Sequence, residues 1–178
     1  MATLMPHKIV FTGPPGAGKT TAIAMLSDVP PVVTDVRNTD ATLDKSHTTV
    51  GLDFGQVDLG DGQCVRLFGT PGQLRFEFMW QIIATDALGL VILIDNSQPD
   101  PLDDLATYLD AYRDLLPTMN CAIGIGRTAE SPLPTIDQFA DLLAEHGLAF
   151  PVLAVDVRRR EDVLMLVDSV LIQAETRV

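Results

Sequence analysis

Short apolar runs alternate along the chain with segments in which apolar residues recur at helical spacing. The apolar runs occupy residues 8–12, 50–59, 64–68, 88–94, 121–125 and 150–155. The helical segments occupy residues 19–26, 102–116, 136–143 and 163–171. Strands that alternate with helices in this way are typical of βαβ units, in which helices cover both faces of one sheet. We therefore predict a three-layer α/β/α fold with a mostly parallel, six-stranded sheet and about five helices.

One turn signal breaks the parallel pattern early in the chain. The sequence Gly60-Asp61-Gly62 separates the second and third apolar runs, and glycine-containing turns of this kind join the strands of a β-hairpin. One strand of the sheet should therefore run antiparallel to the others. Before this hairpin, Pro30 ends the first helical segment, and residues 34–48 are polar and rich in Asp and Thr. We expect a loop there.

Composition limits the class of protein further. The 178 residues are 47% hydrophobic and 20% charged, which excludes a disordered chain and predicts a single domain over residues 1–178. The net charge of -12 argues against non-specific binding to nucleic acid, since its phosphates would be repelled. Cys64 and Cys121 fall in apolar runs and are expected to fill the interior. We find no signal peptide and no apolar run long enough to span a bilayer, so we expect a cytoplasmic protein without an integral membrane segment.

A glycine-rich segment follows the first predicted strand and precedes the first predicted helix. Residues 13–20 read Gly-Pro-Pro-Gly-Ala-Gly-Lys-Thr, which fits the phosphate-binding P-loop pattern in the position that this pattern needs. The glycines let successive backbone N–H groups face one anion, and the following helix adds the positive end of its dipole. The nucleotide-binding residues predicted here are Gly13, Pro14, Pro15, Gly16, Ala17, Gly18, Lys19, Thr20 and Thr21.

Two side chains of this segment have expected roles of their own. Lys19 supplies a positive charge for the terminal phosphates, and the hydroxyl of Thr20 is placed to bind Mg²⁺. The motif predicts a nucleotide site, but it does not choose between a GTPase, an ATPase and a kinase.

Two later segments narrow this choice. Residues 49–54, Thr-Val-Gly-Leu-Asp-Phe, are similar to the effector loop of Rab-type small GTPases. Residues 69–76, Gly-Thr-Pro-Gly-Gln-Leu-Arg-Phe, are similar to their second switch, which normally reads Asp-Thr-Ala-Gly-Gln-Glu-Arg-Phe. Among bacterial proteins, the chain resembles the MglA-like polarity GTPases and the GTPases of actinobacterial conservons, which share the Pro-Gly-Gln form of this switch. The resemblance extends over residues 8–171 and implies a Ras-like G domain that binds GTP or GDP together with Mg²⁺.

The same resemblance implies roles for individual residues. Thr49 would bind Mg²⁺ and sense the γ-phosphate, Gly72 would donate its N–H to that phosphate, and Gln73 would orient the attacking water. The predicted catalytic residues are thus Gln73, Lys19 and Thr49, and the predicted metal ligands are Thr20 and Thr49. Taken singly, Thr49, Gly72 and Gln73 also fit plainer explanations, namely a strand residue, a turn glycine and a solvated helix start.

The second switch departs from the family pattern at its first position. Gly69 stands where the family has an Asp that holds a metal-bound water. Another carboxylate must take this role, and the sequence offers Asp53, Asp58 and Asp95 as candidates.

The guanine-specificity motif of the family, Asn-Lys-x-Asp, is also absent. After the fifth predicted strand the chain reads Gly-Arg-Thr-Ala-Glu at residues 126–130. The family's Asp accepts hydrogen bonds from guanine N1 and N2, which Ala129 cannot do, and Glu130 lies one position late. Arg127 is expected to stack its stem on the base. Val157 matches the usual Ala of the family's third base-contacting segment.

The remaining basic residues and the histidines add little. Arg37 lies in the predicted first switch, where MglA-like GTPases carry an arginine that can act in cis as an arginine finger, and a solvated charge is the alternative. Arg75 is expected to hold the second switch. His7, His47 and His146 have no partner pattern, and we assign them no function.

The sequence leaves three functions open. The first is a switch that binds and slowly hydrolyses GTP and acts with a separate activator or effector, for which the resemblance implies a roadblock-type protein. The second is a degenerate G domain that serves as a scaffold, which the missing base-specificity residues favour and the intact Lys19, Thr20, Thr49 and Gln73 oppose. The third is an ATP-dependent phosphotransferase, for which the interval between P-loop and hairpin is too short to hold a lid.

Overall fold

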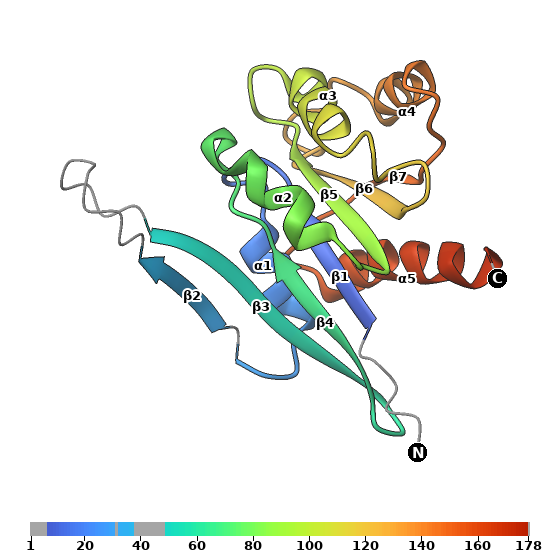
Figure 1. The fold of residues 1–178 in the computed structure, drawn as a ribbon. Helices are drawn as coiled ribbons and strands as arrows, with labels where there is room; N and C mark the ends of the chain where they lie inside the picture. Colours follow the sequence, from blue (N-terminus) through green and yellow to red (C-terminus); the bar gives the residue numbers. More distant parts are fainter. Residues whose placement is uncertain (1–6, 31, 38–48, 178) are drawn as a thin grey trace.

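The structure is a computed structural model that describes residues 7–30, 32–37 and 49–177. Its strands are β1 (His7–Thr12), β2 (Val32–Arg37), β3 (Thr49–Gly60), β4 (Gln63–Gly69), β5 (Gly89–Asp95), β6 (Asn120–Gly126) and β7 (Val152–Ala154). Its helices are α1 (Lys19–Leu26), the short 3-10 helix η1 (Leu74–Phe76), α2 (Glu77–Ala84), α3 (Pro101–Ala111), α4 (Ile136–Glu145) and α5 (Arg160–Thr176). The strands form one sheet in the order β2-β3-β4-β1-β5-β6-β7 (Figure 1).

The sheet is mostly parallel. Strand β1 pairs in parallel with β4 and β5, and β6 continues the parallel sheet from β5 to β7. Strand β3 runs antiparallel to both of its neighbours, β2 and β4, so among the described strands it alone opposes the common direction. The predicted α/β fold with one antiparallel strand and an early hairpin is confirmed.

The segment before the hairpin differs from the prediction. Residues 34–37, which we expected in a loop, belong to strand β2, which pairs with β3 from Val32 opposite Phe54 to Arg37 opposite Thr49. The described sheet therefore has seven strands, one more than predicted. The long strand β3 offers an open row of backbone hydrogen-bonding groups, and pairing along that row outweighs the local polar composition of β2.

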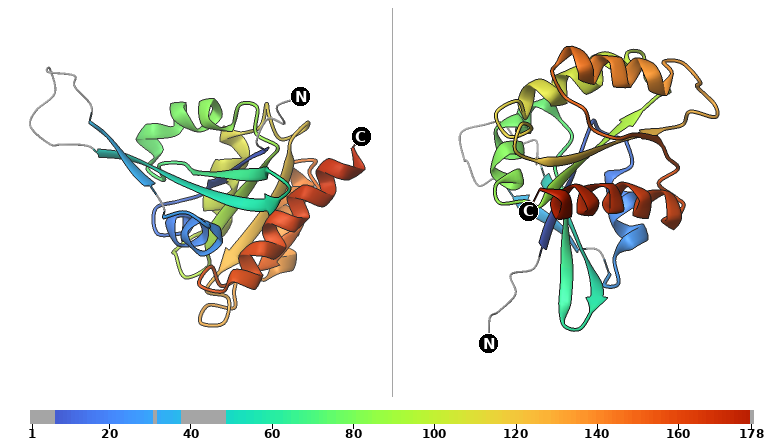
Figure 2. Two further views of the ribbon diagram at one scale, coloured as in Figure 1. Left: turned by 90° about the horizontal axis from the view of Figure 1, so that it is seen from below. Right: turned by 90° about the vertical axis from the view of Figure 1, so that its right-hand side faces the viewer.

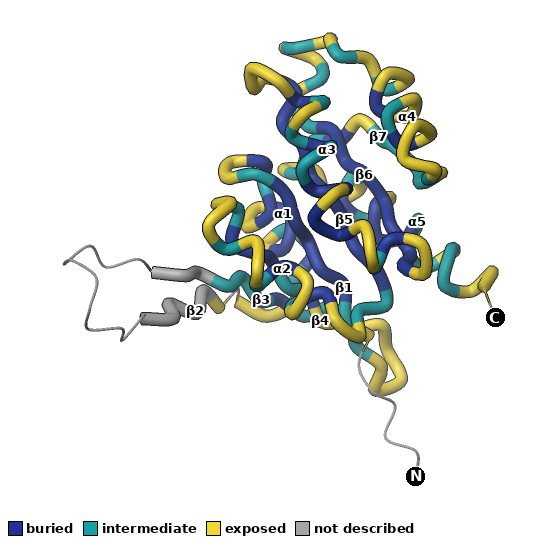
Figure 3. The backbone as a smooth tube through the Cα atoms, turned by 45° about the horizontal axis from the view of Figure 1, so that its top comes forward, coloured by how far each residue is buried: buried dark blue, intermediate teal, exposed yellow. Residues whose placement is uncertain are grey.

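Helices cover both faces of the sheet. Helices α1 and α5 lie on one face, and α2, α3 and α4 lie on the other (Figure 2). The central strand β5 is buried along its whole length, with Leu90, Ile92 and Ile94 facing one layer and Val91 and Leu93 facing the other. Figure 3 shows the same burial in the central strands. A continuous apolar strand is expected where both faces of a parallel sheet are covered.

The interior also includes one of the two cysteines. Cys121 is buried as expected, Cys64 is half-buried, and both thiols are free. None of the helices in the described ranges has the length and apolar character that crossing a membrane requires.

The parallel strands end at a common edge of the sheet, and this edge places the candidate site. The glycine-rich segment of residues 13–18, called the phosphate loop below, follows β1, and the second switch, residues 69–76, begins at the end of β4. The loops after β5, β6 and β7 begin at the same edge. Ligands of open α/β sheets bind outside the carboxyl ends of the strands, where such loops meet.

Candidate functional site

The phosphate loop, residues 13–18, needs glycine at two positions, one for a close backbone contact and one for its left-handed φ. A Cβ on Gly13 would lie 2.1 Å from the carbonyl oxygen of Leu93. Gly18 has a left-handed φ of 101°, and a Cβ there would lie 2.7 Å from Cγ2 of Val157. The first and last glycines of the motif are therefore required by its path between β1 and α1.

Lys19, the first residue of α1, is buried beneath this loop. Its Nζ donates hydrogen bonds of 2.7 Å to the carbonyl oxygens of Gly13 and Pro14. Burial lowers the pKa of Lys19 to about 8, and the nearby Asp53 carboxylate acts in the opposite direction. These contacts hold a cation whose charge titrates close to physiological pH under the loop where terminal phosphates are expected.

Thr20 and Asp53 bring two oxygen donors together beside the loop. Thr20 Oγ1 donates a hydrogen bond of 2.5 Å to Asp53 Oδ2. In the β3–β4 ladder Asp53 lies opposite Gly69, and a Cβ on Gly69 would come 3.0 Å from Asp53 Cβ and 3.1 Å from its Oδ2. Asp53 therefore fills the space that a side chain at position 69 would need. Of the three carboxylates considered from the sequence, it is the one that contacts Thr20.

This pair suits Mg²⁺ by its chemistry. Mg²⁺ binds hard oxygen ligands, usually one or two carboxylates together with phosphate oxygens and waters. Within the described part of the chain no group of three or more His, Cys, Asp and Glu side chains gathers as a metal site. A hydroxyl and one carboxylate next to a phosphate site match this sparse pattern. Thr49 and Arg37, for which we predicted roles, are described only by their backbone in β3 and β2, so the roles of their side chains stay predictions.

The other candidate carboxylates have different partners. Asp58 is exposed in the β3–β4 hairpin, where its Oδ1 accepts a hydrogen bond of 2.8 Å from the N–H of Gly60. Asp95, at the end of β5, is buried and lies 3.2 Å from Nε of Arg127. Burial opposes the ionisation of Asp95, but hydrogen bonds from Ser97 and Gln98 and the charge of Arg127 lower its pKa overall.

The second switch is fixed by two aromatic residues that the sequence analysis did not assign to the site. Nε1 of Trp80 donates a hydrogen bond of 2.6 Å to the carbonyl oxygen of Pro71, and the hydroxyl of Tyr108 donates one of 3.1 Å to that of Gly72. The two rings stack with their centroids 4.4 Å apart. The only signal in the sequence was that both aromatic side chains carry a polar donor, which usually finds a partner when buried.

Gly72 lies directly against the phosphate loop. A Cβ on Gly72 would come 2.6 Å from the backbone nitrogen of Pro15 and 2.8 Å from Nζ of Lys19. The next residue, Gln73, is exposed and precedes η1. The structure thus places the second switch over Lys19, and the catalytic role of Gln73 stays a prediction.

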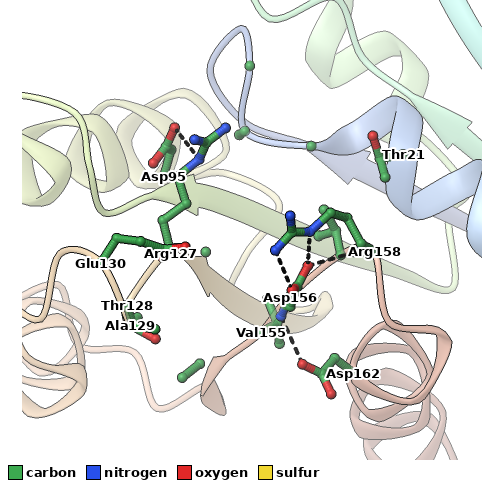
Figure 4. Close-up of a pocket in the computed structure, with 16 residues that line it drawn as sticks. Thr21, Asp95, Arg127, Thr128, Ala129, Glu130, Val155, Asp156, Arg158 and Asp162 are labelled. Carbon is green, nitrogen blue, oxygen red and sulfur yellow. Dashed lines mark hydrogen bonds and ion pairs between the residues drawn. The ribbon is translucent and has the colours of Figure 1, made fainter.

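A cavity of about 530 Å³ opens beside the phosphate loop, at the carboxyl ends of β5, β6 and β7. Its volume is typical of a site for a small molecule. The lining includes Thr21, Arg127 and Val157, which we predicted to bind nucleotide, together with the 126–130 loop and the loop after β7 (Figure 4). Ala129 and Glu130 both line it, and the Ala129 side chain has no hydrogen-bond acceptor.

Arg127 is held at the wall of this cavity. It has a left-handed φ of 59°, and its ion pair with Asp95 fixes the guanidinium while 61% of the side chain stays exposed. An exposed arginine stem with a fixed end is suited to stacking on a planar base.

The loop after β7 carries a charged pair that sequence reasoning missed. Nε and Nη2 of Arg158 donate hydrogen bonds of 2.8 and 2.7 Å to the two carboxylate oxygens of Asp156 (Figure 4). These bonds lower the pKa of Asp156 to about 2. The N–H of Asp156 donates 2.8 Å to Oδ2 of Asp162, which fixes the loop to α5. We selected Val157 from this loop, although opposite charges two residues apart were visible on either side of it.

The sequence of the chain is similar to those of two curated proteins. No protein-family model matches the chain. It is 26% identical over 130 residues to the GTP-binding protein ypt4 of Schizosaccharomyces pombe, which covers 69% of this chain and 51% of that protein. It is 29% identical over 91 residues to an uncharacterized protein of Methanocaldococcus jannaschii, which covers 51% of this chain and 52% of that protein. The chain thus spans about half the length of the curated relatives it matches.

The fold has a counterpart among solved structures. The Arl6 BBS3 small GTPase of Trypanosoma brucei, solved with the nucleotide analogue GppNp, is similar with a TM-score of 0.69 and 15% sequence identity. The match covers 98% of this chain and 100% of that one. Together the comparisons support a relation to the Ras-like small GTPases, and they do not bear out the bacterial subfamily.

Proposed function

We propose that this protein is a nucleotide-dependent switch that binds GTP and GDP with Mg²⁺ and slowly hydrolyses GTP to GDP and phosphate. The observation that carries this proposal is that the phosphate loop, the second switch and the Thr20–Asp53 pair all lie next to Lys19 or beside it in sequence. Lys19 is bonded under the phosphate loop, Gly72 of the second switch lies against its Nζ, and the Thr20–Asp53 pair is adjacent. The small GTPases among the similar proteins support the same function.

Each residue has a defined part in this proposal. The phosphate-loop N–H groups and Lys19 bind the phosphates, and the N–H of Gly72 donates to the γ-phosphate. Thr20 and Asp53 would hold Mg²⁺, which supplies charge neutralisation at the phosphate oxygens. Gln73 orients the attacking water. Because its side chain is exposed, ordering it costs conformational entropy, which fits slow intrinsic hydrolysis.

Exposed apolar side chains next to Gln73 support a partner protein as part of this proposal. The large apolar side chains of Leu74, Phe78 and Ile82 are 62%, 69% and 68% exposed, and their spacing of four residues aligns them on η1 and α2. A stripe of this kind adjoining the second switch supports docking of an activator or effector that orders Gln73. The sequence resemblance suggests a roadblock-type partner in the cytoplasm.

Identification of the bound nucleotide tests this proposal. The purified protein is denatured, and the released nucleotide is separated by ion-exchange chromatography, with Lys19→Ala as the control for binding at the phosphate loop. Release of phosphate from γ-labelled GTP is then followed with and without Mg²⁺. We expect recovered GDP or GTP and slow, Mg²⁺-dependent turnover. Recovery of ADP with transfer to an acceptor would support the phosphotransferase instead.

A scaffold is the second candidate, and Ala129 is the observation that favours it. A pocket without an acceptor at this position forgoes one means of holding guanine tightly. A purified protein without nucleotide, and without measurable affinity for GDP, GTP, ADP or ATP, would support the scaffold.

A further inference from the structure

The cavity beside the phosphate loop, in which we expect the nucleotide base to bind, is called the base pocket below. It lacks a side-chain acceptor at Ala129, although guanine carries donors that need one. Guanine presents N1–H and N2–H₂ along one edge, and an ionised carboxylate can accept from both. Adenine presents an acceptor, N1, at the corresponding place, which a carboxylate would repel. A carboxylate elsewhere on the pocket wall can therefore decide which base is bound.

Four carboxylates line the cavity, and two of them are already engaged. Asp95 accepts hydrogen bonds from the N–H and the hydroxyl of Ser97 and pairs with Arg127. Asp162 accepts the N–H of Asp156 at 2.8 Å. Asp156 and Glu130 remain.

Asp156 is held in one position with acceptor capacity left. Its Oδ1 accepts two hydrogen bonds, from the N–H of Arg158 at 3.0 Å and from Nε at 2.8 Å. Its Oδ2 accepts one, from Nη2 at 2.7 Å. A carboxylate offers about four lone-pair sites, so one site on Oδ2 stays open. The side chain is 37% exposed, which leaves it accessible to a ligand.

The sheet places Asp156 beside the loop that contains Ala129. Strand β7 pairs with β6, with Ala154 opposite Ile125, and the N–H of Val155 donates 2.9 Å to the carbonyl oxygen of Ile125. The residue after Val155 therefore lies alongside the start of the 126–130 loop. Both loops line one cavity, and Figure 4 shows residues 127–130 on one side of it and Asp156, Arg158 and Asp162 toward the other.

We propose that Asp156 selects guanine by accepting a hydrogen bond from its N2 amino group on the open site of Oδ2, while Arg158 holds the carboxylate in place. This inference rests on the proposed nucleotide-binding function. Since the pKa of Asp156 lies near 2, the carboxylate is ionised over the whole physiological range. The acceptor thus comes from the loop after β7, in place of the loop after β6.

Glu130 is the competing acceptor and serves as the matched control. It lines the same cavity, but its side chain is exposed and forms no hydrogen bond within the described residues. Fixing its longer side chain on a base would cost more conformational entropy than using a carboxylate that Arg158 already holds.

The test compares four diphosphates in the presence of Mg²⁺: GDP, IDP, XDP and ADP. Inosine lacks the N2 amino group, and xanthine carries an oxygen there, which an amide can bind but a carboxylate repels. We expect Asp156→Asn to weaken GDP binding by about 10- to 100-fold, the range for loss of a hydrogen bond to a charged group. The ratio of GDP to IDP affinity should fall, and the affinity for XDP should rise. Glu130→Gln should leave all four affinities unchanged.

A third variant separates recognition from loop structure. Arg158→Gln frees the carboxylate but keeps the acceptor, so it should lower the ratio of GDP to IDP affinity by less than Asp156→Asn does, and it should not raise the affinity for XDP. The gain of XDP binding in Asp156→Asn requires a folded pocket, which an unfolded variant could not show. Should Asp156→Asn not fold, Asp156→Ser also removes the carboxylate, and it should show the same fall in the ratio of GDP to IDP affinity that is expected for Asp156→Asn.

The outcomes distinguish this inference from the proposed function. Wild-type protein that binds none of the four diphosphates would overturn both. Wild-type protein that binds GDP, together with an Asp156→Asn variant of unchanged GDP to IDP ratio and no gain for XDP, would overturn only the role of Asp156. A fall in that ratio in Glu130→Gln would assign the role to Glu130.

Discussion

The burial of Lys19 should make phosphate binding depend on pH. Its pKa of about 8 lies below the ordinary value of 10.5, so the side chain loses its charge as the pH rises through about 8. Phosphates favour the charged form, and binding above this pH therefore requires uptake of a proton. We expect the affinity for GDP to be constant well below pH 8 and to fall by up to about tenfold per pH unit above it. Isothermal titration at several pH values measures this.

Two variants isolate the contribution of Lys19. Arginine does not deprotonate in this range, so Lys19→Arg should lose the pH dependence, whatever its absolute affinity. Lys19→Ala should abolish tight binding. In the ligand-free protein, Lys19 of the unfolded state binds more protons than Lys19 of the folded state between about pH 8 and pH 10.5. The free energy of unfolding should therefore rise with pH in this range, and Lys19→Ala should remove the rise. A Lys19→Ala variant with wild-type affinity would refute the phosphate-loop assignment.

Asp53 is expected to govern the Mg²⁺ dependence of nucleotide release. Replacing its carboxylate by an amide removes the charge beside Thr20 but keeps the size of the side chain. We expect Asp53→Asn to lower the apparent Mg²⁺ affinity of the GDP complex by about 10- to 100-fold, as for other groups that tune a metal site. The readout is the rate of GDP release as Mg²⁺ is titrated. The exposed hairpin residue Asp58 provides the control, and an effect of Asp58→Asn equal to that of Asp53→Asn would argue against the site.

Gln73 should affect turnover without affecting binding. In the proposed mechanism it contacts the attacking water and not the ground-state nucleotide, so its removal raises only the barrier to hydrolysis. We expect Gln73→Leu to slow single-turnover phosphate release by about tenfold or more, with the Kd for GTP nearly unchanged. Equal turnover of variant and wild type, with and without an activator, would remove Gln73 from the catalytic residues.

At the scale of elements, the second switch depends on α2 and α3. Trp80 is fully buried, and its Nε1 is the partner of the Pro71 carbonyl. Trp80→Phe leaves that carbonyl without its donor and opens a small void, so we expect a loss of about 1–3 kcal/mol in the free energy of unfolding. Urea unfolding measures the loss. Phe78→Leu, on the exposed side of the same helix, should change stability by less than about 0.5 kcal/mol.

The same elements show what the sequence can predict. The order of strands and helices followed from apolar periodicity, because a buried parallel strand and an amphipathic helix each impose a pattern on the residues that form them. The phosphate loop followed from its motif, because the close backbone contact at Gly13 and the left-handed φ of Gly18 need glycine. Strand β2 did not follow, since its pairing depends on β3 and not on its own composition.

The position of Asp53 could not be derived from the hairpin alone. Counting back from the Gly60–Gln63 pair would place Phe54 opposite Gly69 and turn Asp53 to the other face of the sheet. The ladder shifts between Asp58 and Gly60, so that Asp53 stands opposite Gly69. An irregularity of one residue exchanges the faces of a strand, and the sequence does not mark where it occurs.

At the scale of the whole molecule, nucleotide binding should appear as stabilisation of the fold. A ligand that binds only the folded state at 100 times its Kd adds about 2.7 kcal/mol, which shifts the Tm of a domain of this size by roughly 5–11 °C. Ala129 offers no buried polar group that a wrong base would leave unpaired, and the Asp156 carboxylate is 37% exposed and stays bonded to Arg158 whichever base is present, so we expect guanine to be preferred over adenine by about 10²-fold or less. At equal concentration ADP should then add at least about 0.4 kcal/mol, a small but measurable shift. Ala129→Asp should widen the difference between the two shifts if this loop borders the base. A wild-type preference for GDP above about 10⁴-fold in competition binding would instead mean that Asp156, Glu130 or backbone groups supply full discrimination, and the expectation drawn from Ala129 would be wrong.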